Sequence, residues 1–306
     1  MKIIFQVSGG IGKSIAATAV CAAIKKQYPK DELIVLTGYP DVFVKNPNVN
    51  RVLSGQVNYF YPEYIEGKNS KMFLHDPYNE TDFIYQRGHL IKVWCEMFGI
   101  KYNGEQPELF ITGKEMSTAA AMINSPKPIM LVQTNGGMSD KADKYSWPRD
   151  LPIATAQKVV NAFVQDYTIV HIRRPDQLVL QNTFQATADF RLMAALIAMS
   201  TKRLFIDSFA QHAAAALNMP SHVCWVANLP SQFGYELHNN IIANPPTQQP
   251  EYRNAMFNKY NIGDLPTEFP YQNEAEIFGA DMIIEAVRRD VVKEPAKGKK
   301  PEVAVV

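Results

Sequence analysis

The residues best placed for chemistry lie in the run 203–220, which reads RLFIDSFAQHAAAALNMP. A short apolar strand is expected to end at Asp207 and Ser208, and an alanine-rich helix that carries His212 is expected to begin at once. In an open α/β sheet, ligands bind outside the carboxyl ends of the strands, where a helix N-terminus offers unpaired N–H groups to phosphate. The run therefore predicts an anion site, with an ordinary capped helix as the alternative interpretation.

A second candidate is the segment Ser8–Ser14, SGGIGKS, which follows the apolar run 2–7 and precedes a helical pattern. It partly matches the phosphate-binding loop of nucleotide hydrolases, but Val7 stands where that loop has its first glycine. A lysine is protonated at neutral pH unless burial lowers its pKa, so Lys13 is expected to clamp an anion and not to act as a base. A hydrolase that uses Lys13 and Ser14 stays an alternative.

Composition narrows the class of protein. The chain has 306 residues, 46% of them apolar and 20% charged, with a net charge of +1. This length predicts two domains of about 150 residues, and the charge predicts no general attraction to nucleic acid or membrane. No apolar run reaches the roughly 18 residues of a membrane span. The isolated residues Cys21, Cys95 and Cys224 indicate reduced thiols in a cytoplasmic protein, with neither a disulfide frame nor a metal site.

Strand and helix patterns alternate along both halves of the chain, which predicts an α/β fold. The segment Ser125–Pro128 contains two prolines in three residues and is the expected boundary. It separates an N-terminal domain, 1–125, from a C-terminal domain, 129–290, and the tail 291–306 is expected to be disordered. The longest expected helix is 80–98. The expected strands are 2–7, 33–37, 49–53, 72–74, 109–112, 129–133, 168–172, 203–206 and 223–226.

The run from Asp189 to Val226 resembles the C-terminal signature of glycosyltransferase family 9, the heptosyltransferase-like enzymes. In that family a strand is followed by Asp-Ser/Thr-Gly, then His, an alanine-rich helix, and Pro. The departure is Phe209, which stands where the family usually has glycine. The matching residues here are Asp207, Ser208, His212, Ala213, Ala216, Leu217 and Pro220.

The segment 133–148 is similar to the donor loop of the same family, in which a strand-end Thr or Ser and a loop lysine meet the nucleotide diphosphate. The resemblance implies donor-binding roles for Thr134, Lys144 and the adjoining Asn135 and Gly136. The family lysine usually lies two residues before Trp, whereas Lys144 lies three before it. A lysine opposite a diphosphate replaces a metal as counter-charge, which implies a metal-independent reaction without a cofactor.

The segment His171–Asp176, HIRRPD, is similar to a short element of fucosyltransferases in which arginine forks a diphosphate. Arg173 is therefore a further donor-binding candidate, with surface ion pairing as the alternative.

The loop after the first expected strand lacks the acidic residue that family 9 has there. The family pattern is roughly G-x-G-D, with the Asp as the proposed general base, but Gly10 and Gly12 are followed here by Lys13. Gly10, Gly12 and Ser14 are expected on the acceptor side. Asp76 and the adjacent His75, at a neighbouring strand end, are the first candidates for the base, with a turn residue before Pro77 as the alternative interpretation of Asp76. The aromatic segment 55–70 is expected either to wall the acceptor or to be a packed surface loop.

The resemblance implies a GT-B protein, with two Rossmann-like domains that face an interdomain cleft. It implies inverting, metal-independent transfer of a sugar from a nucleotide-diphosphate sugar to a hydroxyl group of a glycan or lipopolysaccharide-type acceptor. Three alternatives remain at this point: a glycosyltransferase that acts on a modified base in DNA, which the near-zero charge does not favour; a P-loop-type hydrolase; and an inactive sugar-nucleotide-binding protein.

Overall fold

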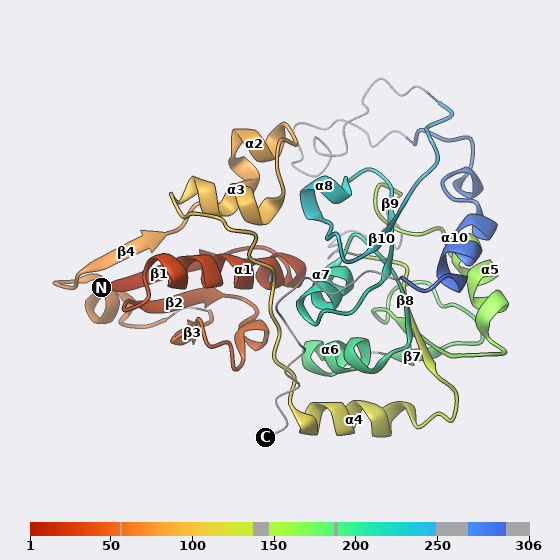
Figure 1. The fold of residues 1–306 in the computed structure, drawn as a ribbon, viewed down its shortest axis with the longest axis horizontal. Coiled ribbons are helices and arrows are strands. Elements are labelled where there is room, and N and C mark those ends of the chain that lie inside the picture. Colours follow the sequence, from red (N-terminus) through yellow and green to blue (C-terminus); the bar gives the residue numbers. More distant parts are fainter. Residues whose placement is uncertain (56, 137–146, 187–188, 249–268, 292–306) are drawn as a thin grey trace.

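Two separate parallel sheets organise the chain (Figure 1). The computed structural model describes residues 1–55, 57–136, 147–186, 189–248 and 269–291. The first sheet has the order β3-β2-β1-β4 and the second has the order β10-β9-β8-β5-β6-β7. The strands are β1 (Lys2–Val7), β2 (Glu32–Thr37), β3 (Arg51–Leu53), β4 (Ser70–Phe73), β5 (Ile129–Gln133), β6 (Thr168–Ile172), β7 (Phe184–Ala186), β8 (Lys202–Ile206), β9 (His222–Trp225) and β10 (Asn239–Ile242).

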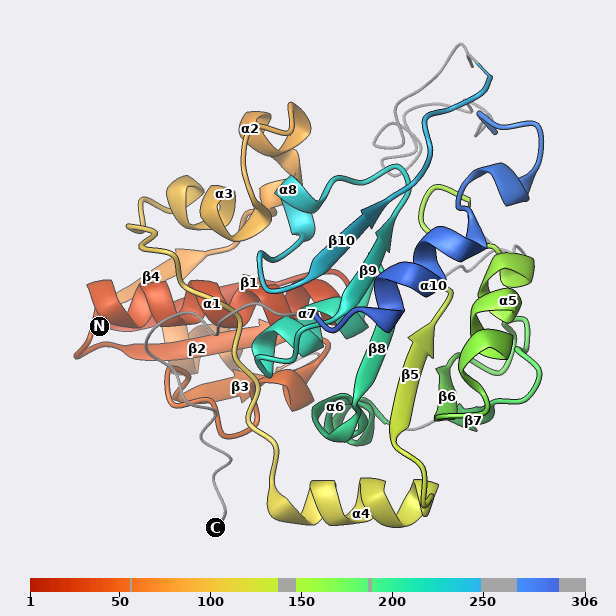
Figure 2. The same cartoon turned by 45° about the vertical axis from the view of Figure 1, so that its right-hand side comes forward.

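Helices cover these sheets, and the predicted α/β class with two Rossmann-like halves is confirmed. Helices α5 and α10 pack on one face of the second sheet, and α6 and α7 pack on the other (Figure 2). Among the described helices, none has both the length and the apolar content needed to cross a bilayer. The helices are α1 (Ile11–Gln27), α2 (Thr81–Ile84), α3 (Leu90–Met97), α4 (Gly113–Ile123), α5 (Ile153–Phe163), α6 (Phe190–Met199), α7 (Phe209–Ala216), α8 (Pro230–Phe233) and α10 (Ala280–Arg288).

Three predictions about single elements were wrong. The segment 109–112 forms no strand, although Leu109 is buried, because apolar burial does not by itself supply a strand partner. The expected helix 80–98 is divided into α2 and α3, since Gln86 between them has a left-handed backbone with φ 57°. Part of the expected irregular segment 241–272 belongs to strand β10.

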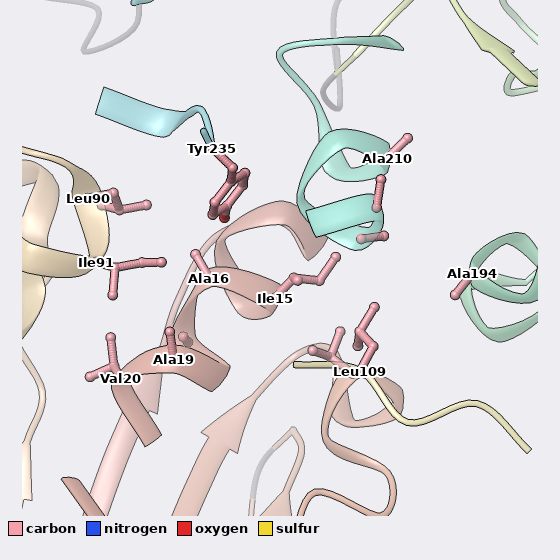
Figure 3. Close-up of a cluster of buried hydrophobic side chains, with 14 of the residues drawn as sticks. Ile15, Ala16, Ala19, Val20, Leu90, Ile91, Leu109, Ala194, Ala210 and Tyr235 are labelled. Atoms are coloured by element: carbon pink, nitrogen blue, oxygen red, sulfur yellow. The ribbon is translucent and has the colours of Figure 1, made fainter. Parts of the chain in front are cut away.

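Helix α1 is buried on nearly all sides and joins the two halves of the molecule. Its residues Ile15, Ala16 and Ala19 are inaccessible to solvent and share one core with Ala210 of α7 (Figure 3). A helix that is apolar all round belongs in a protein interior, and small alanine side chains let the backbones of α1 and α7 approach closely. The two sheets are therefore held together by one continuous hydrophobic core.

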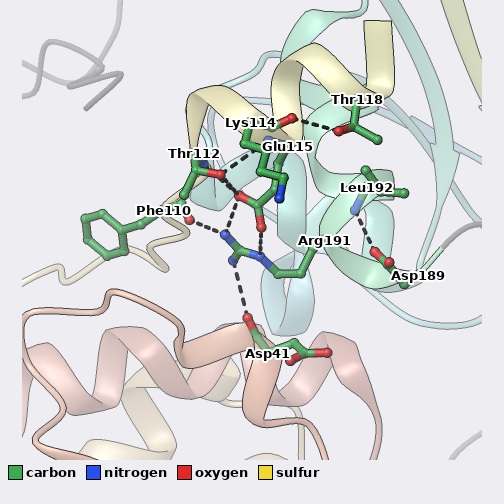
Figure 4. Close-up of polar contacts among 9 residues, drawn as sticks. All are labelled: Asp41, Phe110, Thr112, Lys114, Glu115, Thr118, Asp189, Arg191 and Leu192. Carbon is green, nitrogen blue, oxygen red and sulfur yellow. Dashed lines mark hydrogen bonds and ion pairs between the residues drawn. The ribbon is translucent and has the colours of Figure 1, made fainter. Parts of the chain in front are cut away.

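Arg191 of α6 provides a polar link between the same halves (Figure 4). Its Nε donates to Glu115 Oε1 of α4 at 2.7 Å, and its other nitrogens reach the carbonyl oxygens of Phe110 and Asp41. Thr112 caps α4 and also bonds Glu115. The hydrogen bond from Arg191, together with those from Thr112, lowers the pKa of Glu115 to about 2 against the opposing effect of burial. The expected domain boundary after residue 125 stays a prediction, and α4 itself packs against α6.

Replacing the buried arginine should destabilise the protein. We expect Arg191→Met to lower the free energy of unfolding by about 2–3 kcal/mol at neutral pH, because a charged hydrogen-bond network loses its centre. The stability that comes from the depressed pKa of Glu115 is present above its ordinary value of 4.5 and is lost as the pH falls toward about 2. The difference in free energy of unfolding between wild type and variant, measured by urea titration, should therefore become smaller as the pH is lowered. Arg87→Met, which breaks an exposed ion pair with Asp82, is the control and should change little.

Candidate functional site

The first loop of the N-terminal sheet meets the start of α7 at Gly12. A Cβ placed on Gly12 would lie 2.8 Å from His212 Cδ2 and 3.4 Å from Phe209 Cα, so only glycine permits this approach. Since β1 and α1 are joined only by Ser8–Gly10, the whole loop lies beside the residues that follow β8. The two places that the sequence singled out for chemistry are therefore adjacent in space.

Lys13 and Asp76 form an ion pair at the carboxyl ends of β1 and β4. Lys13 Nζ lies 2.5 Å from Asp76 Oδ2, which also accepts a hydrogen bond of 2.9 Å from Ser8 Oγ. The ammonium group lies over the ring of Tyr78, with Nζ 4.2 Å from the centroid, and Trp94 contributes a second aromatic face. The Lys13 side chain is 3% exposed, whereas that of Asp76 is 30% exposed. The carboxylate, and not the ammonium group, is the member of the pair that solvent reaches.

Burial and hydrogen bonding set the charges of this pair. Burial lowers the pKa of Lys13, and Asp76 opposes that effect. Burial works to raise the pKa of Asp76, but the hydrogen bonds from Lys13, the Tyr78 backbone N–H and Ser8 outweigh it and hold that pKa below its ordinary value. Asp76 is therefore an ionised carboxylate at neutral pH.

The residues that would bind a phosphate and its metal ion in a phosphate-binding loop are bonded within the protein. Lys13 lies in the first turn of α1, and its ammonium group is paired with Asp76. The Ser14 hydroxyl, which would ligate Mg²⁺ in such a loop, is inaccessible to solvent and lies within bonding distance of the Gly10 carbonyl oxygen. The hydrolase alternative gains no support from this arrangement.

Strand β8 delivers Asp207 and Ser208 to the start of α7, as the sequence predicted. Asn228 Nδ2 donates to Asp207 Oδ2 at 2.5 Å, which fixes that carboxylate. Ser208 is partly exposed at the N-cap of α7, and its hydroxyl receives a hydrogen bond from Gln133 Nε2 at 3.3 Å. No side chain among the described residues caps the first N–H groups of α7, which are the groups that a helix start offers to an anion.

The end of β5 is held by a buried polar network. Thr134 Oγ1 lies 2.9 Å from His171 Nε2, and Asn135 Nδ2 donates to Asp150 Oδ2 at 2.9 Å. Asp150 also accepts a hydrogen bond from the Gly136 backbone N–H. Burial and the charge of Arg173 lower the pKa of His171 to about 4, so the imidazole is neutral. Thr134 is inaccessible to solvent, and this geometry gives it and Asn135 a role in shaping the loop.

Gly136 marks a close approach that the sequence did not reveal. A Cβ on Gly136 would lie 3.0 Å from Ser208 Oγ and 3.1 Å from Arg149 Nε. The guanidinium group of Arg149 is therefore beside the start of α7, and no carboxylate within the described residues forms an ion pair with it. Sequence reasoning passed over Arg149 because it lies in the turn after Trp147-Pro148, where no motif includes it.

The remaining candidates lie in different surroundings. His212 is buried with its Nδ1 2.8 Å from the Tyr235 hydroxyl, which places it in the contact between α1 and α7. Arg173 donates to the Pro175 carbonyl oxygen at 3.1 Å, and its charge contributes to the lowered pKa of His171. Lys144 lies outside the described residues. Gly10 is the N-cap of α1 and has no atom within 4 Å of a Cβ position.

Solved structures share this fold. The glycosyl transferase family 9 structure from Veillonella parvula is 12% identical, with a TM-score of 0.66 over 94% of this chain and 96% of that one. The ADP-heptose LPS heptosyltransferase II of E. coli is 11% identical, with a TM-score of 0.68 over 94% of this chain and 98% of that one. The dodecameric iron-containing heptosyltransferase TibC with ADP-D-beta-D-heptose is 12% identical, with a TM-score of 0.62 over 95% and 76%.

These similarities show that the chain has the GT-B fold of glycosyltransferases, as the sequence motifs predicted. No family model matches the sequence. No curated protein matches it either.

A side chain at position 12 should separate the two helices. We expect Gly12→Ala to lower the free energy of unfolding by about 1–3 kcal/mol, because the new methyl group overlaps the fixed imidazole of His212. Gly113→Ala is the matched control: it also lies in the first turn of a helix, and a Cβ there meets no atom within 4 Å. Helix propensity favours alanine over glycine by about 1 kcal/mol, so the control should be at least as stable as wild type in chemical denaturation. An equally stable Gly12→Ala protein would contradict the close contact.

Proposed function

We propose that this protein is a glycosyltransferase that moves a sugar from a nucleotide-diphosphate sugar to a hydroxyl group, with inversion and without a metal ion. One observation carries the proposal: the contact of Gly12 with Phe209 and His212 brings an ionised acid on one sheet beside an anion-binding helix start on the other. A GT-B enzyme needs both, because the acceptor must lose a proton while the diphosphate leaves with negative charge. Each sheet supplies one of these requirements.

The start of α7 is proposed to receive the leaving diphosphate. Within the described part of the chain no side chain caps its first N–H groups, the partly exposed Ser208 lies beside Gly136, and Arg149 adds a positive charge there. Fixed positive groups stabilise a developing anion without reorganisation. We propose that these groups, together with Lys144, offset the negative charge of the diphosphate in place of a metal ion. Asp207, held by Asn228, is proposed to bind hydroxyl groups of the donor sugar.

Asp76 is proposed as the general base. The acceptor hydroxyl oxygen attacks the anomeric carbon from the side opposite the diphosphate, its proton passes to the Asp76 carboxylate, and the bond from the anomeric carbon to the phosphate oxygen breaks. Lys13 and Ser8 both donate to the Oδ2 atom of Asp76, which orients the carboxylate and keeps it ionised. This pairing favours a positioning role for Lys13 over a direct clamp on phosphate.

The solved structures with this fold indicate which nucleotide and which acceptor to test first. Solved neighbours include a heptosyltransferase with ADP-D-beta-D-heptose and an LPS heptosyltransferase, so ADP-linked sugars and lipopolysaccharide-type glycans are the first substrates to test. An inactive protein would bind such a donor without turnover on any acceptor, and the variants below separate that outcome from catalysis.

Neutralising the base should slow the chemical step. We expect Asp76→Asn to reduce kcat by about 10²–10⁴-fold with little change in the KM for the donor, because only proton removal is lost. Since the change leaves Lys13 buried without its partner, the double variant Lys13→Met with Asp76→Asn tests activity in a fold without that unpaired charge. Asp82→Asn, at an exposed ion pair, is the control. Full activity in the double variant would exclude Asp76 as the base.

Removing the positive charge beside α7 should weaken donor binding. We expect Arg149→Met to raise the dissociation constant for a nucleoside diphosphate about tenfold, which corresponds to about 1.4 kcal/mol. Titration calorimetry with ADP measures the effect directly and does not depend on turnover. Arg174→Met removes another arginine, one that pairs with Asp176, and should leave the affinity near that of wild type. Equal affinities in all three proteins would place the diphosphate elsewhere.

A further inference from the structure

A cavity of about 520 Å³ lies at the carboxyl ends of β1, β2 and β3. Its lining includes Gln6 on β1, Leu36 on β2 and Leu53 on β3. Leu36 and Leu53 pack around the cluster of Ile4, Ile34 and Tyr64, whereas the neighbouring positions of β1 and β2 face α1. The cavity is therefore on the sheet face opposite α1, at the edge where α/β folds bind ligands.

The chemistry of the wall is neutral and has two parts. Leu36, Leu53 and Phe60 give apolar surface, and the ring of Phe60 is fixed by stacking on Tyr64 with centroids 5.4 Å apart. Gln6 supplies a carboxamide that is exposed and that makes no hydrogen bond to any other described residue, so it is free to donate to and accept from a ligand. None of the described residues that line the cavity carries a formal charge.

Two glycines keep the cavity open. A Cβ added at Gly38 or at Gly55 would meet no atom within 4 Å, so the backbone at both positions borders empty space. Gly55 has φ +70°, which glycine alone adopts readily, whereas Gly38 has an ordinary backbone. Position 38 can therefore carry a side chain without strain, and that side chain would occupy part of the space now open.

The cavity lies at the same edge of the sheet as the proposed base. Gln6 and Val7 of the cavity wall continue directly into Ser8, whose hydroxyl donates to Asp76. Asp76 follows β4, the strand that pairs with β1 on the side away from β2, and neighbouring strands are about 4.8 Å apart. The cavity and the Asp76 carboxylate therefore lie at the same carboxyl-end edge of this sheet, and Ser8 links the cavity wall to the carboxylate.

We propose that this cavity is the acceptor site and that it takes an uncharged pyranose, with the apolar face of the ring against Phe60 and hydroxyl groups on the Gln6 carboxamide. The inference rests on the proposed glycosyl transfer and adds the class of acceptor. The volume is within the range of about 300–1,000 Å³ that small-molecule sites occupy. A carboxylate or phosphate on the ring would lose water without gaining a counter-charge, which the neutral wall cannot offset.

An acceptor panel tests the class of substrate. With the donor fixed, methyl glycosides of neutral hexoses should be used with kcat/KM at least about tenfold higher than the matching uronates and sugar phosphates, because the charged groups would be buried unpaired. A preference for the charged members, or for nucleosides as models of a base in DNA, would overturn the proposal.

A variant that fills part of the cavity tests whether the acceptor binds there. We expect Gly38→Val to raise the KM for a neutral acceptor about tenfold, because the side chain fills space that the ring requires. The melting temperature and the affinity for ADP report whether the fold and the donor site are intact. Gly279→Val, at another glycine whose Cβ would meet nothing, is the matched control. An unchanged KM in Gly38→Val would place the acceptor elsewhere.

A binding measurement separates failure of this inference from failure of the proposed function. Saturation-transfer NMR of neutral methyl glycosides should show contact with wild type and with Gly279→Val but not with Gly38→Val. If glycosides bind in this pattern while no donor is turned over, the cavity is a sugar site and the transferase proposal fails. If transfer occurs without binding that depends on position 38, the transferase stands and the cavity is not its acceptor site.

Discussion

The arrangement depends on one contact, the approach of the N-terminal end of α1 to the N-terminal end of α7. Glycine at position 12 and alanines along both helices let the two backbones come close, and the burial of this seam from solvent joins the cores of both sheets. Because each helix directly follows the carboxyl end of a strand, packing helix start against helix start also brings together the edges where parallel sheets bind ligands. Packing and site formation have the same physical origin here.

The same contact lies beside a residue at which the chain departs from the pattern of glycosyltransferase family 9, which its sequence resembles. Phe209 stands where family 9 usually has glycine, a residue that allows close backbone approach. In this chain the ring of Phe209 packs edge-on against Phe190 of α6, with centroids 6.4 Å apart, and the glycine at the contact is Gly12. A second departure is Lys13, which stands where the family 9 pattern has Asp. Here a carboxylate is supplied by Asp76, which follows the neighbouring strand and pairs with Lys13.

The distribution of charge differs between the two sheets, in line with their different proposed roles. On the second sheet, Arg149 and the start of α7 present positive charge where a diphosphate would leave. On the first, the lysine is paired and covered by aromatic rings, so that the exposed charge is the carboxylate. The cavity beyond it is neutral. An anion is therefore attracted to one side only, and this asymmetry would orient a donor relative to an acceptor.

Local pattern in the sequence determined the α/β organisation, the positions of most strands along the chain and the delivery of Asp207 and Ser208 to a helix start, because period, caps and breakers act over a few residues. The carboxyl-end rule also identified Asp76 as a neighbour of the first loop. Only the tertiary structure decided which groups meet. Lys13 and Asp76 are 63 positions apart, Arg149 reaches Gly136 through a turn without a motif, and the buried run at 109–112 found no strand partner. Such pairings depend on how whole helices and sheets pack, a constraint that no short stretch of sequence contains.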